Sequence, residues 1–282
     1  MKVSISQALK NVASEKYNKQ NIFLFFILIL ITGLIYFLLP VKLQDPELMK
    51  QLIPNEVIDL LTSPKTLIIA IANFILSLLI LGFTITATNN AVNEREEICL
   101  NPFTNFGKML AKGFVCSVGS AIVYILICIL AIIPTMLLVK ISPYFFIFIF
   151  FFVLVMVHAW LCVFLRFYMT LKFKDWFSFK SSWIMIANNI RRYGSYIGKS
   201  LLLFILFIVC SISVSLIFGF AQGLVNLAPV ASIATAIKTS INILSTLIQS
   251  VIMCLFAMYN IDLTAQLLTP IARKEKEEIT QE

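Results

Sequence analysis

The sequence predicts an all-α fold: a polytopic membrane helical bundle with six transmembrane helices and cytoplasmic amphipathic interfacial helices. Hydrophobic residues make up 60% of the 282 residues and charged residues only 13%, whereas a soluble domain carries roughly 25% charged residues. Apolar runs of about 20 residues recur, which is the length that an α-helix needs to cross the hydrocarbon layer. The runs are continuous rather than alternating, and lipid offers backbone polar groups no outside partner, so helices are predicted rather than strands.

The expected spans divide the chain into three parts. Residues 1–20 are predicted to form a cytoplasmic amphipathic N-terminal helix, residues 21–268 the transmembrane domain, and residues 269–282 a charged cytoplasmic tail. The six spans are expected at about 22–39, 67–88, 114–139, 143–165, 197–221 and 239–263. Pro134 lies inside the third span, where the missing backbone donor predicts a kink.

The positive charges predict which side of the membrane each connection faces. Of the 22 Lys and Arg residues, seventeen lie in the N-terminus, the connection 89–113, the stretch Arg166–Lys199 and the tail. Because cytoplasmic loops are enriched in Lys and Arg, both termini are predicted to be cytoplasmic, in a cell (plasma or inner) membrane. The net charge of +8 then reflects topology and attraction to anionic lipid, and no nucleic-acid partner is expected.

The stretch Arg166–Lys199 is the longest polar interruption and carries seven basic residues against one acid, Asp175. Helical spacing places one apolar stripe on it, made of Phe179, Trp183, Ile186, Ile190 and Tyr193. The candidate contacts to anionic inner-leaflet lipid are Lys180, Trp183, Arg191 and Arg192. The enrichment of Lys and Arg in cytoplasmic loops also accounts for the charge by itself, so a specific ligand is not implied.

Two weaker amphipathic segments indicate a repeat. A similar stripe lies within residues 5–13, and Asn101 is expected to cap a helix that begins at Pro102. Each amphipathic segment precedes two spans, and the odd-numbered spans begin at intervals of roughly 85–90 residues. Repeats of this kind are familiar in transporters, but they also arise in inert scaffolds.

Three polar side chains within the spans, those of Asn73, His158 and Gln249, are candidates for function, because polar groups are expensive in lipid. His158 is interpreted as a proton relay or ligand, or as a neutral imidazole bonded to a neighbouring helix. The absence of a carboxylate at matching depth favours the second interpretation. Asn73 and Gln249 are each expected to hydrogen-bond across helices, for about 0.6–2 kcal/mol. Counted by depth, the three residues are staggered, which argues against one compact polar substrate site.

Two charged residues mark the cytoplasmic ends of spans four and six. Arg166 and Asp262 lie at similar depth there, and we expect them to form an ion pair, or Asp262 to pair with another basic residue. A structural pair is favoured over a site for a coupling ion.

No motif for catalysis or metal binding is found. The sequence contains no GxSxG, HExxH or P-loop pattern and no pair of acidic residues buried in the spans. The six cysteines have no CxxC spacing, which argues against zinc and disulfide roles. We therefore expect no enzyme activity, no catalytic, cofactor-binding or metal site, and no cofactor.

Two segments carry a resemblance to a known group of proteins. They are FLRFYMTLKFKDWFSFKSSWIMIANNIRRYGSYIGKSLLL and, before the third span, NPFTNFGKMLAKGF. The chain resembles an uncharacterised prokaryotic family of six-span membrane proteins, known only as a domain of unknown function. That family is similar to the membrane domain of some bacterial glycerophosphodiester phosphodiesterases. The resemblance implies a helical bundle without established activity, and the phosphodiesterase catalytic domain is absent.

Two functions are compatible with these observations. The first is a membrane scaffold or interaction module that binds anionic inner-leaflet lipid and partner membrane proteins through its basic amphipathic stretch. The second is a small transporter or channel component for an apolar or amphiphilic solute. The possible repeat, the kink expected at Pro134 and the polar residues within the spans support the second reading.

Overall fold

The computed structural model describes residues 3–39, 54–141, 146–225 and 231–281, and the regular structure in these ranges is helical, as predicted. The long helices are α2 (Lys19–Leu34), α6 (Pro64–Val92), α7 (Phe106–Ile141), α8 (Phe146–Thr170), α10 (Ile190–Val225) and α11 (Ala231–Gln281). The shorter helices are α1 (Ile5–Val12), α5 (Pro54–Thr62) and α9 (Phe179–Ala187). Three 3-10 turns are η1 (Glu15–Tyr17), η2 (Ile35–Leu38) and η4 (Phe173–Phe177).

Six helical segments are long and apolar enough to cross a membrane. They are Glu15–Leu34, Pro64–Val92, Phe106–Leu130, Phe152–Thr170, Ile190–Val225 and Ala236–Glu278. The prediction of an all-α, multi-pass helical bundle is therefore confirmed. The kink expected at Pro134 lies outside the residues whose packing the structure describes.

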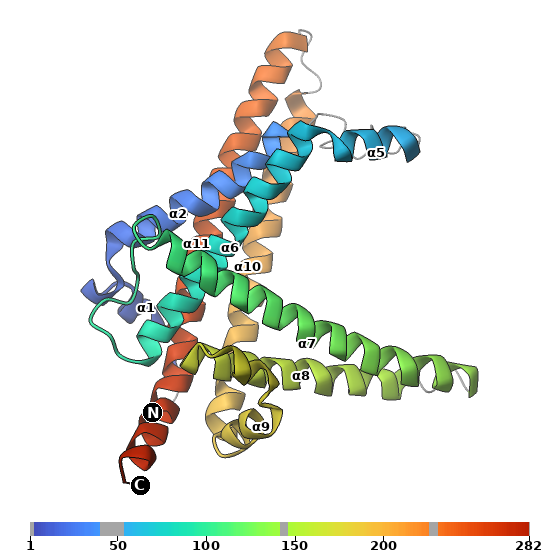
Figure 1. Cartoon of the computed structure of the whole chain (residues 1–282). Helices are drawn as coiled ribbons and strands as arrows, with labels where there is room; N and C mark the ends of the chain where they lie inside the picture. Colours follow the sequence, from blue (N-terminus) through green and yellow to red (C-terminus); the bar gives the residue numbers. More distant parts are fainter. Residues whose placement is uncertain (1–2, 40–53, 142–145, 226–230, 282) are drawn as a thin grey trace.

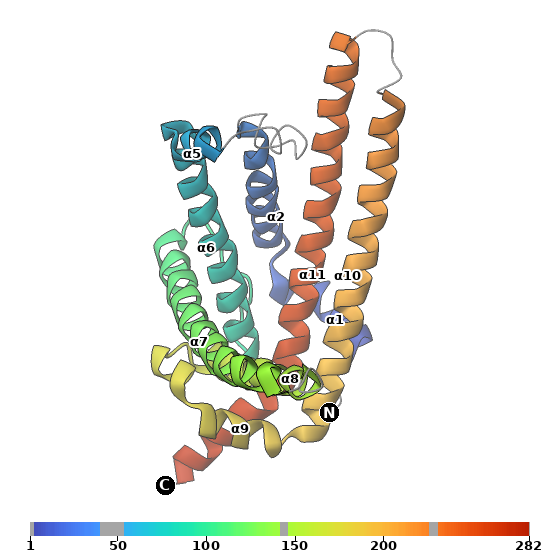
Figure 2. The same ribbon diagram turned by 90° about the vertical axis from the view of Figure 1, so that its right-hand side faces the viewer.

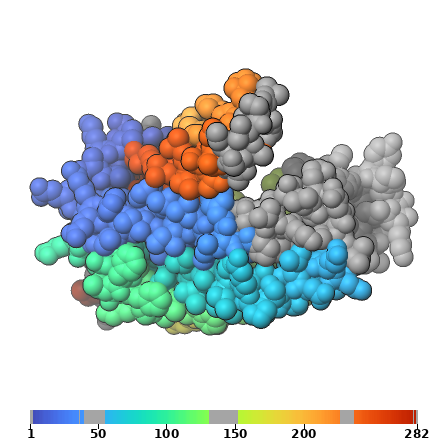
Figure 3. Space-filling view, turned by 90° about the horizontal axis from the view of Figure 1, so that it is seen from above, coloured from blue at the N-terminus to red at the C-terminus, as the bar shows by residue number. Residues whose placement is uncertain are grey.

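The long helices form a group of four and a diverging hairpin. α10 and α11 lie side by side, and α11 also packs against α2 and α6 (Figure 1). Seen from above, α2 lies between α11 and α6 (Figure 3). The hairpin of α7 and α8 points away from this group, toward the viewer in Figure 2. Both chain ends and α9 lie at one end of the molecule, which we call the terminal end, and α5 lies at the other (Figure 2).

Local sequence explains where several helices begin and end. Ser63 caps α6, because its Oγ accepts a hydrogen bond from the backbone N–H of Thr66 (3.3 Å), and Pro64 occupies the first helical position. α8 ends before Leu171, which adopts a left-handed φ of 56°, and η4 follows. The chain thereby turns out of α8 into the segment that leads to α9.

Two glycines allow α6 and α7 to cross with their backbones in contact. A Cβ atom at Gly82 would lie 1.9 Å from the carbonyl oxygen of Met109. A Cβ atom at Gly113 would lie 2.0 Å from the carbonyl oxygen of Leu78. No side chain fits at such distances, so the crossing requires glycine at both positions.

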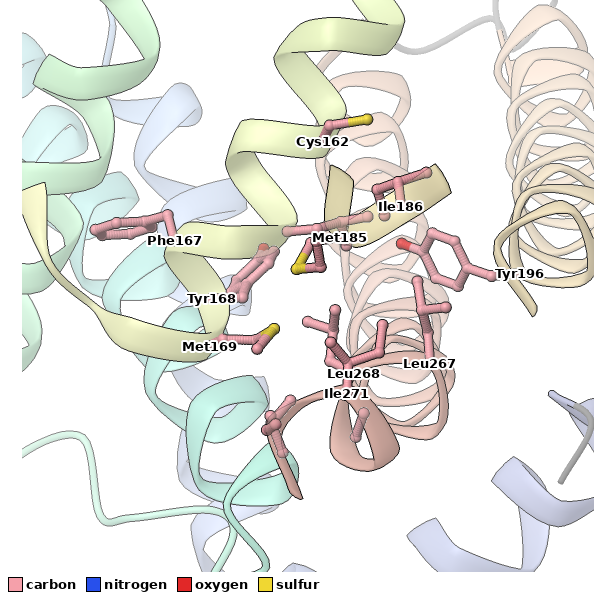
Figure 4. Packing of buried hydrophobic residues seen from close by; sticks show 14 of the residues in the cluster. Cys162, Phe167, Tyr168, Met169, Met185, Ile186, Tyr196, Leu267, Leu268 and Ile271 are labelled. Carbon is pink, nitrogen blue, oxygen red and sulfur yellow. The ribbon is translucent and has the colours of Figure 1, made fainter. Parts of the chain in front are cut away.

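An apolar core lies at the terminal end, where α8, α9, α10 and α11 meet (Figure 4). Its labelled side chains are Cys162, Phe167, Tyr168, Met169, Met185, Ile186, Tyr196, Leu267, Leu268 and Ile271. Trp176 of η4 is fully buried in the same cluster, and a Cβ atom at Gly119 of α7 would lie 2.5 Å from its indole. The segment from η4 to α9 is therefore fixed to the bundle through buried side chains.

The N-terminal helix is shorter than predicted, and the charged tail is helical. Residues 1–20 do not form one helix, because α1 ends at Val12 and α2 begins at Lys19. α11 continues without a break through Pro270 to Gln281, and the cytoplasmic position of this tail stays a prediction. Side chains of α11 near this boundary pack into the core at the terminal end, which holds the helix in place beyond the apolar span.

The amphipathic helix expected within Arg166–Lys199 is divided, because Asn188 and Asn189 separate α9 from α10. Its apolar stripe is divided too: Ile186 and Tyr193 are buried, whereas Phe179, Trp183 and Ile190 are exposed. The buried side of α9 consists of Ser182, Met185 and Ile186. The face of α9 that packs on the bundle is therefore rotated from the predicted one.

The expected amphipathic helix before span three is absent from the described residues. Asn101 caps a turn, since its Oδ1 accepts the backbone N–H of Phe103 (2.9 Å), and α7 begins only at Phe106. Short helices precede the first and the last pair of long helices but not the middle pair. The three-unit repeat is therefore incomplete in this part of the chain.

Candidate functional site

An exposed surface of basic and aromatic side chains covers η4, α9 and the start of α10. Its apolar members, each 40–53% exposed, are Phe173, Phe177, Phe179, Trp183 and Ile184. Its basic members, also exposed, are Lys172, Lys174, Lys180 and Arg191. We call these nine residues the basic–aromatic face. Exposed apolar side chains beside Lys and Arg fit the boundary between lipid and water.

Three of the four residues predicted to contact lipid belong to the basic–aromatic face: Lys180, Trp183 and Arg191. Arg192 is half-buried. The acid within this segment does not neutralise the face, because Asp175 is buried and accepts a hydrogen bond from Thr170 Oγ1. None of the basic residues on the face forms an ion pair with an acidic residue in the described ranges. The nine residues of the face therefore carry four positive charges and no carboxylate.

A groove of about 380 Å³ lies between α8 and α9. Its lining residues are Ala159, Cys162, Phe179, Lys180, Trp183 and Ile184. Five of these side chains are apolar, and the sixth is a lysine whose long stem can lie along an apolar surface while its ammonium group stays in water. An acyl chain with an anionic head group has the complementary chemistry.

His158 of α8 contacts side chains of α9 and α10. Its Nδ1 lies 3.3 Å from the hydroxyl of Tyr193. Its ring stands edge-on to Tyr193, with ring centroids 5.0 Å apart, and to Trp183, with centroids 6.2 Å apart. The geometry is that of an imidazole bonded to a neighbouring helix, which is one of the two interpretations drawn from the sequence.

A second hollow, which we call the bundle cavity, has a volume of about 650 Å³ and lies among α2, α6, α10 and α11. Its polar lining from α6 and α11 consists of Asn73, Ser77, Thr84, Thr246, Gln249 and Ser250. Gln249 Nε2 donates a hydrogen bond to Ser215 Oγ of α10 (3.3 Å), so it bonds across helices as expected. The side-chain amide of Asn73 has no hydrogen-bond partner among the described residues.

The expected staggering of the three intramembrane polar residues is wrong for two of them. Asn73 and Gln249 line the same cavity, while His158 lies apart from it on α8. α10 and α11 extend beyond α2 and α6 at the end opposite the terminal end (Figure 2). Counting residues from the start of each span therefore misjudges how deep a residue of α11 lies relative to one of α6.

The predicted ion pair between Arg166 and Asp262 is wrong. Arg166 Nη1 lies 3.5 Å from Glu275 Oε1, and Arg166 Nε lies 3.7 Å from Asp175 Oδ1. Asp262 is buried and forms no ion pair with a described basic residue. Its donors are Tyr17 Oη at 2.9 Å, Asn11 Nδ2 at 3.1 Å and Gln266 Nε2 at 2.7 Å. Neutral side chains of the N-terminal segment and of α11 itself therefore surround the Asp262 carboxylate, where a basic side chain was expected.

Residues 66–219, just over half of the chain, match the family model DUF4013, which is described as a protein of unknown function. The chain belongs to the DUF4013 family. The predicted kinship with an uncharacterised membrane-protein family is thus confirmed. No curated protein and no solved structure matches the chain. The resemblance to the membrane domain of glycerophosphodiester phosphodiesterases stays a prediction.

The DUF4013 match covers only part of the candidate sites. It begins at the start of α6 and ends within α10, so it contains the whole basic–aromatic face and the groove between α8 and α9. Asn73 also lies within it, whereas Gln249 and Asp262 do not. The bundle cavity of this DUF4013 protein is completed by α2 and α11, which lie outside the matched residues.

Asparagine side chains that no sequence pattern predicted hold the terminal end of this DUF4013 protein together. Asn89 Nδ2 donates to the carbonyl oxygens of Tyr168 and Met169, both at 2.8 Å. The last carbonyls of a helix such as α8 have no partner within the helix. Asn21 Nδ2 similarly donates to the carbonyl oxygen of Cys99 at 2.7 Å. In the sequence, only the position of Asn89 and Asn21 near the ends of spans hinted at this role. Polar residues are common at such positions, so the hint is weak.

Metal and thiol chemistry receive no support from the described residues. None of them form a group of three or more His, Cys, Asp or Glu that could hold a metal ion. Burial raises the pKa of the Cys99 thiol to about 12, so that thiol stays protonated at neutral pH. The expected absence of catalysis and of cofactors stays a prediction.

Proposed function

We propose that this multi-pass membrane protein is a non-catalytic interaction module that holds anionic lipid at its basic–aromatic face and organises lipid or partner membrane proteins there. The observation that supports the proposal is the exposure of Trp183 and four Phe and Ile side chains beside four basic side chains on one short segment. In this proposal the terminal end faces the cytoplasm of the cell membrane, and no cofactor takes part.

The energetics of the face suit reversible lipid binding. A basic residue close to an anionic surface contributes about 1 kcal/mol of attraction, and Trp is enriched at the membrane–water boundary. The groove between α8 and α9 adds apolar walls for an acyl chain next to Lys180. The head group and the chain of one lipid would thus be recognised by adjacent parts of the same segment.

The segment is also held rigid, which lowers the cost of binding. Trp176 is fully buried against Phe167, with ring centroids 5.1 Å apart, and Met185 and Ile186 anchor α9 in the core. A surface that is ordered before binding loses less conformational entropy when its ligand arrives.

Removing two charges from the face should weaken the preference for anionic lipid. The double variant Lys180→Gln/Arg191→Gln is expected to lose up to about 2 kcal/mol, or about 30-fold, of its preference for phosphatidylglycerol over phosphatidylcholine. The measurement is competition between brominated lipids in nanodiscs, read as quenching of tryptophan fluorescence. The variant Trp183→Phe identifies the share of the signal that arises on the face.

A matched control removes the same charge elsewhere. Lys65 is exposed near the start of α6, and Lys238 is half-buried within the first part of α11. The double variant Lys65→Gln/Lys238→Gln should keep the wild-type preference. An equal loss in both double variants would mean that net charge alone causes the effect, and this result would contradict the proposal.

A second candidate function, passage of an apolar or amphiphilic solute, is favoured by the bundle cavity. A hollow of about 650 Å³ lies within the range of 300–1,000 Å³ typical of small-molecule sites. Protein-dependent movement of a labelled amphiphile across proteoliposomes would support this candidate. Lipid preference without such movement would favour the interaction module alone.

A further inference from the structure

Polar side chains are interspersed with apolar ones around the bundle cavity, whose lining surface is mostly apolar. Eight of its fourteen lining residues are polar, and they come from all four surrounding helices. Besides those of α6 and α11, they include Thr32 of α2 and Ser211 of α10. A polar group at the depth of the hydrocarbon is costly unless it is bonded or faces a polar occupant.

No charged residue lines the bundle cavity. An ionised head group would lose its hydration there and find no counter-charge, which makes its transfer unfavourable. The lining therefore selects an uncharged polar group.

Five of the six lining hydroxyls have already used their protons, and the exception is Ser211. Ser77 Oγ donates to the carbonyl oxygen of Asn73 at 2.8 Å, and Ser250 Oγ to that of Thr246 at 2.8 Å. Thr32, Thr84 and Thr246 donate in the same way, each to the carbonyl four residues earlier. A hydroxyl that has donated its proton still offers lone pairs, so these five side chains can bond an occupant only as acceptors.

The two amides complete this pattern. Gln249 Nε2 already donates one of its two N–H groups to Ser215 Oγ, which leaves the carbonyl oxygen as an acceptor and one N–H as a donor. The amide of Asn73 and the hydroxyl of Ser211 have no partner among the described residues, so they offer three donors and two acceptors. Acceptors thus outnumber donors in the cavity, and an occupant with hydroxyl or amide donors fits it best.

We propose that the bundle cavity binds an uncharged amphiphile from the bilayer whose head group donates hydrogen bonds, as a monoacylglycerol or a long-chain alcohol does. Ile80, Leu81, Phe207 and Met253 line the same cavity and provide apolar contact for the first part of the chain. The inference deepens the second candidate function and rests on it. The test needs no transport, so binding and passage can fail separately.

The test measures equilibrium binding of 1-monooleoylglycerol to the purified full-length protein in detergent by native mass spectrometry. Saturable binding is expected, and Asn73→Leu and Ser211→Leu should each weaken it by about tenfold, as expected when hydrogen bonds to the head group are lost. Neither side chain has a hydrogen-bond partner among the described residues, so little folding stability is at stake. Variants are compared only when each elutes as one species at the wild-type volume.

A matched variant and two other probes keep the proposal falsifiable. Ser213 lies two residues from Ser211 on α10 and does not line the cavity, so Ser213→Leu should bind like wild type. Methyl oleate, which only accepts hydrogen bonds, and oleate, which is charged, should each bind about tenfold more weakly than 1-monooleoylglycerol. Absence of saturable binding, equal weakening by Ser213→Leu, or equal binding of either other probe would overturn the proposal.

Discussion

Gly82→Ala is expected to destabilise the bundle by about 3 kcal/mol, the upper end of the cost of overpacking a core. The new methyl group would lie 1.9 Å from the carbonyl oxygen of Met109 and 2.6 Å from its carbonyl carbon. Both atoms belong to the backbone of α7, so no side-chain rotation relieves the clash and the two helices must separate. Unfolding in mixed detergent micelles with increasing SDS, followed by circular dichroism, measures the loss.

Gly113→Ala should have a similar effect, because it acts at the same crossing. Its methyl group would lie 2.0 Å from the carbonyl oxygen of Leu78 and 3.2 Å from the backbone nitrogen of Gly82. Once one methyl group has separated the helices, the second meets less resistance. The double variant is therefore expected to lose clearly less than the sum of the two single losses.

Two glycines of α10 provide the control. A Cβ atom at Gly198 or Gly219 meets nothing within 4 Å. Alanine is favoured over glycine within a helix by about 0.8–1 kcal/mol in water, so these variants should be neutral or slightly more stable. If Gly198→Ala and Gly82→Ala lower stability equally, close packing of α6 on α7 is not the cause.

The fold class was predictable because it depends on properties that act locally along the chain. Long apolar runs must form helices in lipid, and their number and approximate position follow from composition alone. The close crossing at Gly82 and Gly113 was not predictable in this way. At five other glycines an added Cβ atom would meet nothing within 4 Å. The presence of a glycine therefore does not reveal where two helix backbones are in contact.

The candidate sites were only partly predictable, because they depend on how helices lie relative to one another. Lys180, Trp183 and Arg191 were identified from helical spacing, which is local. Asn73 and Gln249 line one cavity because α11 extends farther than α6 at the end opposite the terminal end (Figure 2). Counting residues along each span does not reveal this difference. The partners of Asp262 were not predictable from local spacing either, because Tyr17 lies 245 residues away in the chain.

Asp262→Asn is expected to release the N-terminal segment from the bundle. The carboxylate is buried and accepts hydrogen bonds from Tyr17 and Asn11 of the N-terminal segment and from Gln266 of α11. An amide of the same shape has one acceptor oxygen and turns an N–H toward these donors. Hydrogen bonds to charged groups contribute about 1.5–3 kcal/mol each, so we expect a loss of about 3 kcal/mol.

Trypsin cleavage after Lys10 and Lys16 measures this release. Both lysines are exposed on the N-terminal segment, but the segment must undock before the protease can bind its backbone. When undocking is fast relative to cleavage, the rate follows the open population, so about 3 kcal/mol corresponds to more than about 100-fold faster cleavage. Tyr17→Phe removes one of the donors and should give an intermediate rate.

The control for the Asp262 experiment is the exposed ion pair between Arg273 of α11 and Glu94, which follows α6. Arg273 Nε donates to Glu94 Oε2 at 2.9 Å, and this hydrogen bond lowers the pKa of the Glu94 carboxyl. The pair therefore contributes fully at neutral pH, and its contribution is lost only as the pH falls through that lowered pKa. Because the pair is solvent-exposed, Arg273→Gln should change the cleavage rate by no more than about fivefold at neutral pH. If it accelerates cleavage as much as Asp262→Asn does, general loosening of α11 explains both results and the Asp262 network does not dock the N-terminal segment.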